Sequence, residues 1–220
     1  MSSRVTVTAP VRPAVRVPKT FALAAVLLLA CAFVFHYVFP YYLHYNPAGF
    51  EGFWPRRGWL LAHISSGMVA LLIGPFQFSR WLRQRYLRLH RLMGRVYLIA
   101  VLCGSIGALA LSITTPDGRP WGFGLQGLIL AWMTTAGMAY YAIRQRQIQV
   151  HQEWMVRSYV VTFAFVTFRL LYDVPPMSRL GSPNERGITY IWACWALPLL
   201  ATEVILQLRR MRPRGAQSAG

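Results

Sequence analysis

Long apolar runs separated by short polar connections dominate this chain. A helix of about 20 mostly apolar residues is long enough to cross the hydrocarbon layer of a membrane. Six segments meet this requirement, at roughly 21–43, 58–79, 91–113, 121–143, 153–173 and 187–208. Because the runs are continuous and do not alternate, they favour helices over the strands of a membrane barrel. We therefore expect an all-α integral membrane bundle of six transmembrane helices over residues 21–208, with basic tails at 1–20 and 209–220.

The composition supports a membrane protein. Of the 220 residues, 55% are hydrophobic and 13% are charged, whereas soluble domains average about 25% charged residues. Lysine and arginine number 23 against 6 acidic residues, which gives a net charge of +17. These basic residues punctuate the apolar runs and do not cover one face, which disfavours a nucleic-acid partner. The composition excludes a soluble globule with a single core and makes the lipid bilayer the expected surroundings.

The distribution of arginine predicts the orientation. Connections on the cytoplasmic side of membrane proteins carry an excess of lysine and arginine. Most basic residues outside the apolar runs lie in the two tails, at 80–91 and at 144–146, and fewer lie at 56–57, 119 and 179–186. Both termini are therefore predicted to be cytoplasmic.

Histidines occur at two depths of the predicted bundle. His36 and His63 lie toward the outer ends of their runs, whereas His90 and His151 lie at inner ends. Ionisable groups inside a membrane are costly, and each is a functional hypothesis by default. Facing helices that supply histidines at two depths are the arrangement of bis-histidine haem sites. We expect His90 and His151 to bind the iron of an inner haem b, and His63, with His36 as the available partner, to bind an outer one.

Neighbouring residues fit a flat cofactor. Gly67 and Gly94 follow His63 and His90 by four residues, so each glycine shares a helix face with its histidine and leaves room for a macrocycle. Hydrogen bonding to a neighbouring helix, or a place at the membrane interface, would also account for these histidines. The run at 121–143 holds no histidine, which leaves the outer site short of ligands.

Buried charges suggest further roles. Arg95 and Arg157 lie near the inner histidines and are expected to bind haem propionates. Met155, four residues after His151, is an alternative soft ligand for the iron.

Other polar residues lie inside or beside the runs. Arg169 and Asp173 are four residues apart and are expected to neutralise each other. Glu203 is expected to pair with an arginine of the tail or loops, with proton transfer as the alternative. Proline at position 75 frees a backbone carbonyl, and Gln77 is its expected partner.

Several short motifs together resemble a known family. They read His63…Gly67…Gly74-Pro75-Phe76-Gln77-Phe78, Leu89-His90-Arg91…Gly94-Arg95-Val96-Tyr97 and His151…Trp154-Met155-Val156-Arg157-Ser158-Tyr159. Over roughly 59–173 the chain is similar to the bacterial membrane proteins called domain of unknown function 2306. The resemblance implies a multi-pass protein of the cytoplasmic (inner) membrane, and it implies no activity. The layering of histidines also has a looser architectural likeness to di-haem b-type membrane cytochromes.

Three functions remain open at this point. The first is a haem b-binding electron carrier or membrane reductase component, whose redox partner is a quinol or another donor. The second is a small transporter or lipid-handling protein that uses Arg95, Arg157, Arg169, Asp173 and Glu203. The third is a structural or assembly subunit without chemistry. No nucleotide-binding, zinc-protease or nucleophile motif of soluble enzymes is present, so the question whether the protein is an enzyme stays open.

Overall fold

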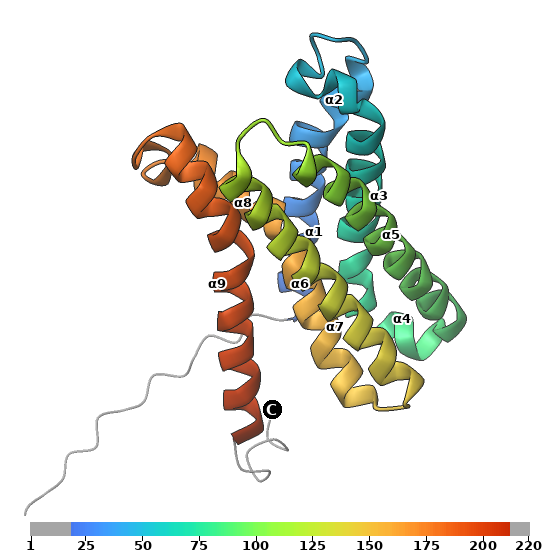
Figure 1. The fold of residues 1–220 in the computed structure, drawn as a ribbon. Helices are drawn as coiled ribbons and strands as arrows, with labels where there is room; N and C mark the ends of the chain where they lie inside the picture. Colours follow the sequence, from blue (N-terminus) through green and yellow to red (C-terminus); the bar gives the residue numbers. More distant parts are fainter. Residues whose placement is uncertain (1–18, 212–220) are drawn as a thin grey trace, which may run out of the picture.

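The chain folds into helices joined by short connections (Figure 1). The computed structural model describes residues 19–211, and these residues contain no strand. The elements are α1 (Lys19–Phe33), the π-helical turn η1 (Val34–Val38), α2 (Phe39–Leu43), the 3₁₀ turn η2 (Glu51–Arg56), α3 (Arg57–Gln77), α4 (Arg80–Arg85), α5 (Leu87–Ile113), α6 (Arg119–Arg144), α7 (Ile148–Thr162), α8 (Ala164–Asp173), the 3₁₀ turn η3 (Met177–Arg179) and α9 (Pro183–Met211). The all-α class is confirmed. Nearly all of the tail predicted at 1–20, and residues 212–220 of the other tail, lie outside the described residues.

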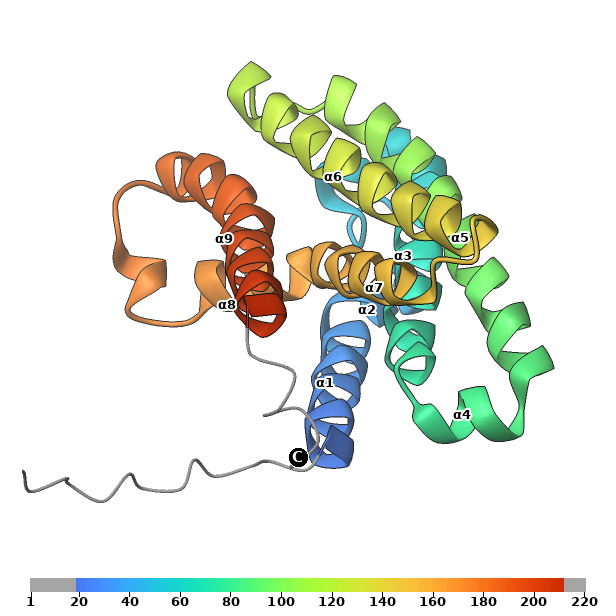
Figure 2. The same cartoon turned by 90° about the horizontal axis from the view of Figure 1, so that it is seen from below.

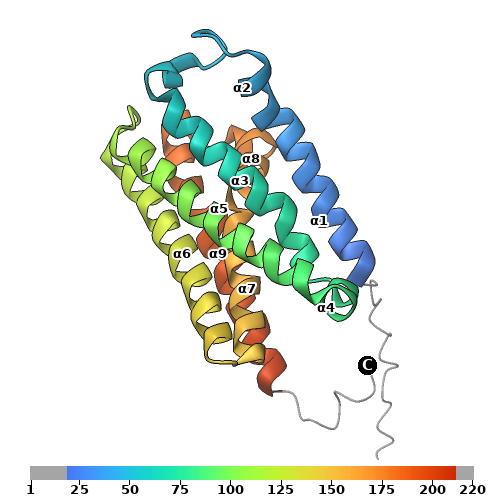
Figure 3. The same ribbon diagram turned by 90° about the vertical axis from the view of Figure 1, so that its right-hand side faces the viewer.

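The long helices run up and down between two ends of the bundle (Figures 1 and 3). One end, which we call the α2 end, holds the connections at 44–56, 114–118 and 174–182. The other, the α4 end, holds α4 and the turn between α6 and α7. The first described residues of α1 and the last of α9 both lie at the α4 end (Figure 3).

Seen from the α4 end, α7 lies at the centre of the bundle (Figure 2). It packs against α6 and α3 on one side and against α9 on the other. Helix α1 lies at the periphery, where it contacts α3. The elements α7 and α8 form one long segment that is interrupted at Phe163.

Five helical segments of the described chain are long and apolar enough to cross a membrane, namely Phe21–Leu43, Gly52–Gln77, Leu87–Ile113, Ile148–Asp173 and Pro183–Met211. They are the number and kind of helices expected of a multi-pass membrane protein, and they coincide with five of the six predicted runs. The remaining run, 121–143, lies in α6, which has 26 residues but is not among the five. Large apolar side chains on the outside of α5, including Leu92, Ile99 and Ile106, are about half exposed in the isolated chain, as expected for a surface that lipid covers.

Small residues bring α3 and α5 close together. A Cβ atom added to Gly107 would lie 2.8 Å from the Trp59 carbonyl oxygen, and one added to Gly104 would lie 3.3 Å from the Ser66 Cβ. Small residues at such contacts allow the backbones of membrane helices to approach closely. This contact positions His63 of α3 against the backbone of α5.

Proline within α3 frees a carbonyl that a neighbouring helix satisfies. Pro75 has no backbone N–H, so the Leu71 carbonyl lacks its usual donor four residues later. The Tyr159 hydroxyl of α7 donates to this carbonyl at 3.0 Å. The prediction that Gln77 fills this role is wrong, because its amide nitrogen is buried and has no hydrogen-bond partner within the described residues. Gly74 leaves the space that the Tyr159 ring fills.

Candidate functional site

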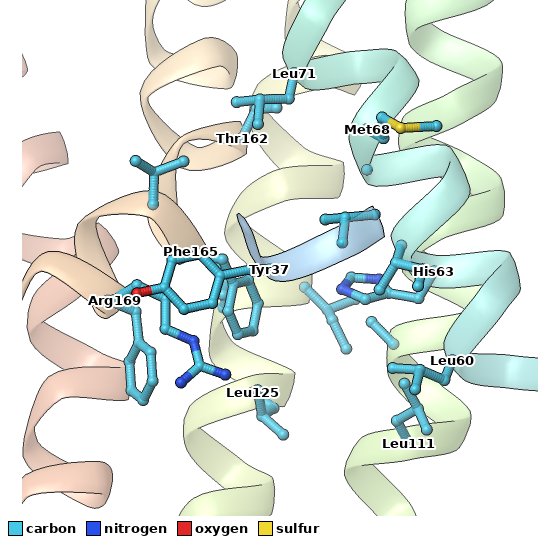
Figure 4. Close-up of a pocket in the computed structure, with 18 of the residues that line it drawn as sticks. Tyr37, Leu60, His63, Met68, Leu71, Leu111, Leu125, Thr162, Phe165 and Arg169 are labelled. Carbon is cyan, nitrogen blue, oxygen red and sulfur yellow. The ribbon is translucent and has the colours of Figure 1, made fainter. Parts of the chain in front are cut away.

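A cavity of about 300 Å³ lies inside the bundle toward the α2 end (Figure 4). On α3 it is bounded by residues three and four positions apart, which share one face of that helix. Most of the lining is apolar or aromatic, including Leu60, Ile64, Gly67, Met68, Leu71, Leu125, Leu128, Trp132, Phe165 and Phe168. We call it the His63 cavity, after the histidine in its wall.

His63 is held in one orientation and one tautomer. Its Nδ1 lies 2.9 Å from the Gly104 carbonyl oxygen of α5. A carbonyl only accepts, so Nδ1 carries the proton and Nε2 is left as an acceptor. The rings of Trp132 and Phe165 meet the imidazole edge-on, with centroids at 6.5 and 6.0 Å. His63 therefore forms the hydrogen bond to a neighbouring helix that was expected from the sequence as the alternative to haem binding. A histidine held in this way is also suited to bind a metal through its other nitrogen.

The wall opposite His63 carries a charged cluster. The Tyr37 hydroxyl donates to the Asp173 Oδ2 at 2.6 Å, and the Arg169 guanidinium lies 4.8 Å from the centre of the Tyr37 ring. Arg169 also forms an ion pair with Asp173 at 3.9 Å, which confirms the predicted neutralisation. Tyr37 lies in η1, and π-helical turns are frequent at functional sites. Arg169 and Tyr37 both line the His63 cavity.

Beside the cavity lies a cluster of buried hydroxyl groups. The Tyr97 hydroxyl lies 2.8 Å from the Ser158 Oγ and 2.7 Å from the Thr162 Oγ1. The Trp132 indole donates to the same Thr162 oxygen at 2.8 Å. The cluster joins α5, α6 and α7. Two of its members, Trp132 and Thr162, also line the cavity and are held in place by these hydrogen bonds. Sequence reasoning missed it, although a tyrosine amid apolar residues and hydroxyls four positions apart in α7 were available signals.

The predicted outer pair of histidines does not come together. His36 is exposed, its ring meets that of Tyr37 edge-on at 4.6 Å, and it does not line the cavity. Only one of the two expected ligands, His63, therefore faces this space. A bis-histidine haem would need a second ligand on the opposite side of the iron.

The predicted inner pair lies near the α4 end. The His151 Nδ1 lies 2.8 Å from the Ala139 carbonyl oxygen of α6, which leaves Nε2 as its acceptor. The His90 Nδ1 is buried and has no partner among the described residues. The two imidazoles are close enough to interact electrostatically. Neither histidine lines the His63 cavity.

The two predicted arginine ligands differ in their surroundings. Arg95 is exposed on α5. Arg157 is buried, and its Nε donates to the Glu203 Oε2 at 2.9 Å while a second carboxylate, Glu153, lies at 3.9 Å. Glu203 thus pairs with an arginine inside a span and not with one from the tail or loops. The carboxylates neutralise Arg157, which leaves it poorly placed to bind a propionate.

The buried charges do not converge on one space. Arg169 lines the His63 cavity, whereas Arg157 and Glu203 form a separate cluster that does not. Within residues 19–211, no group of three or more histidine, cysteine, aspartate or glutamate side chains is placed to hold a metal ion. The site best formed for a ligand is therefore the His63 cavity.

Comparison with known proteins identifies a family. The model of the family described as "Predicted membrane protein (DUF2306)" matches residues 60–206, from α3 through most of α9. No curated protein and no solved structure matches the chain. The match reaches further toward the carboxyl end than the segment of about 59–173 over which the motifs resemble this family.

Proposed function

The chain belongs to the DUF2306 family of predicted membrane proteins, and from this premise we propose that it crosses the bacterial cytoplasmic membrane six times with both termini in the cytoplasm. The sixth span is α6, which runs beside α5 and α7 and has 26 residues, one fewer than α5. The start of α1 and the end of α9 lie at the α4 end, where the arginines of 80–91 also lie. The positive-inside rule makes this the cytoplasmic end.

Reporter fusions test this orientation. Alkaline phosphatase, which is active only outside the cytoplasm, is expected to be active when fused within 114–118 or 174–182 and inactive when fused at 145–147. A fluorescent protein fused to the carboxyl end is expected to fluoresce. Phosphatase activity at 145–147, or inactivity at 114–118, would contradict the proposed topology.

We propose that the protein binds a small, mostly apolar molecule from the bilayer in the His63 cavity. The observation that carries this proposal is the Nε2 acceptor of His63, which faces a mostly apolar space. The cavity volume of about 300 Å³ is at the lower end of the range for small-molecule sites, which are typically apolar with a few placed polar groups. Within residues 19–211 no group donates to this nitrogen, and a ligand that donates a hydrogen bond would supply the missing partner.

Extraction of the purified protein tests the binding function. The full chain is purified in detergent and extracted with organic solvent, and the released molecules are identified by mass spectrometry. We expect one molecular species in about equimolar amount with the protein. The proposal fails if a variant with a filled cavity releases the same molecules in the same amounts.

A second proposal concerns the α4 end, where His90 and His151 would hold haem b through their ring nitrogens. The supporting observation is the pair of available nitrogens, since His151 keeps Nε2 free and the His90 Nδ1 lacks a partner within the described chain. Bound haem would supply one-electron transfer, and the histidines would position the iron. In this reading the protein is an electron carrier or a component of a membrane reductase.

An absorption spectrum tests the haem proposal. The dithionite-reduced minus oxidised spectrum of protein made in haem-supplied cells is expected to show a b-type band. The band should be lost in His151→Ala and kept in the control His36→Ala, whose histidine is exposed. A spectrum without a band, or a band lost only in His63→Ala, would overturn the assignment to His90 and His151.

A further inference from the structure

We infer that the molecule held in the His63 cavity is a quinol, a flat ring with an oxygen at each end and an apolar tail. This inference rests on the proposed binding function and assigns its ligand class. It is drawn from the chemistry of the two facing walls, the rings between them and the mostly apolar remainder of the cavity.

The two walls offer complementary polar groups. On α3, His63 presents the Nε2 acceptor, because its Nδ1 donates to Gly104. On α8, Arg169 presents a guanidinium, which carries only donors. Figure 4 shows both side chains directed into the space between the two helices. A ligand that satisfies both walls has a donor at one edge and an acceptor at the other, as the two oxygens of a para-quinol do.

The rings around the cavity favour a flat ligand. Trp132 and Phe165 meet the His63 ring edge-on, and Phe168, which stacks on Tyr172 at 5.4 Å, lines the same space. Aromatic groups pack well against other rings in offset or edge-to-face arrangements. The remaining lining on α3 and η1, including Met68 and Val34, is apolar and suits a hydrocarbon tail.

The charge near Arg169 disfavours other membrane ligands. Asp173, at 3.9 Å, partly neutralises the guanidinium, so an anionic lipid headgroup gains less there than a neutral oxygen does. A sterol, with one hydroxyl, would satisfy only His63, and a fatty acid would satisfy only Arg169. A quinol satisfies both groups and adds no net charge to the membrane interior, where charge is costly.

Titration with a decyl-tailed benzoquinol under anaerobic conditions tests this assignment, with the quenching of tryptophan fluorescence as the signal. The wild-type protein is expected to bind this quinol about tenfold more tightly than its dimethyl ether, because the ether cannot donate to His63. In His63→Asn the side-chain amide can still donate to Gly104, but the Nε2 acceptor is gone. This variant is expected to bind the quinol about tenfold more weakly and to bind the two probes equally.

Two further variants test the Arg169 wall and control for the histidine substitution. Arg169→Met is expected to weaken quinol binding about tenfold, whereas His36→Asn, the same substitution at an exposed histidine, is expected to leave it unchanged. Equal binding of quinol and ether by the wild type, or unchanged quinol binding in His63→Asn, would overturn the ligand class. Solvent extraction identifies the bound molecule without any added quinol. If it releases a different molecule from the cavity, the quinol inference is refuted and the proposed binding function still holds.

Discussion

Replacement of Gly67 by leucine is expected to reduce the molecule released by solvent extraction at least tenfold. Gly67 lies one helical turn after His63 and lines the same cavity. A Cβ atom built at this position meets no atom within 4 Å, so the new side chain enters open space. Leucine would fill part of a cavity of about 300 Å³, which is small enough that a ligand and the new side chain would compete for it. The fold should tolerate the change, because glycine inside a helix is less favourable than alanine by about 0.5–1 kcal/mol and leucine is a good helix former.

The chain offers a matched control for this substitution. Gly137 of α6 is exposed, also meets nothing within 4 Å of an added Cβ, and does not line the cavity. Gly137→Leu is therefore expected to release as much ligand as the wild type. The wild type, Gly67→Leu and Gly137→Leu should have similar melting temperatures in detergent. If Gly67→Leu releases the same molecules as Gly137→Leu, the His63 cavity is not the binding site.

The membrane spans could be predicted from the sequence because a helix surrounded by lipid must be long and continuously apolar. Length and continuous apolar character predict where helices cross, and five of the predicted runs lie in helices that meet this criterion. Helix α6 is the difficult case, because Arg119, Gln126 and Thr135 dilute its apolar character. Its inner face packs on α5, α7 and α9, and a helix covered by other helices needs a less apolar surface than one surrounded by lipid.

The rotation of each helix was much harder to predict than the depth of its residues. Counting along the apolar runs places His36 and His63 in one layer, but only His63 lines the cavity. Successive helical residues point about 100° apart, so Tyr37 lines the cavity while His36, its neighbour, is exposed. The π-helical turn at Val34–Val38 changes the register locally, and no pattern in the sequence marked it.

Pairs between distant helices were not visible from local spacing. The Arg169–Asp173 pair, four residues apart, followed directly from helix geometry. In contrast, Arg157 and Glu203 are 46 residues apart, and Tyr159 and Leu71 are 88 residues apart. Which carboxylate meets which arginine depends on how α7 and α9 pack, and the apolar runs carry little information about that packing.

Replacement of Gly74 by alanine is expected to destabilise the bundle by about 3 kcal/mol, at the upper end of the range for overpacked cores. A Cβ atom at this position would lie 2.1 Å from the Tyr159 Cε2 and 2.3 Å from its Cδ2. These are atoms of a rigid ring that is 8% exposed and whose hydroxyl is tied to the Leu71 carbonyl. The ring cannot retreat without breaking that hydrogen bond and separating α7 from α3. The measurement is the melting temperature of the purified protein, with the yield from membranes as a second readout.

The sign of the stability change on replacing glycine by alanine distinguishes a steric clash from a gain in helix propensity. Gly137→Ala adds the same methyl group where nothing lies within 4 Å, so it should leave stability unchanged or raise it by up to about 1 kcal/mol. In a Tyr159→Ala background the obstructing ring is absent, and the further change Gly74→Ala should then cost little, which is the coupling expected of residues in contact. Equal melting temperatures for Gly74→Ala and Gly137→Ala would show that α3 and α7 do not pack through this glycine. Additive losses in the double variant would show that the Tyr159 ring is not what Gly74 accommodates.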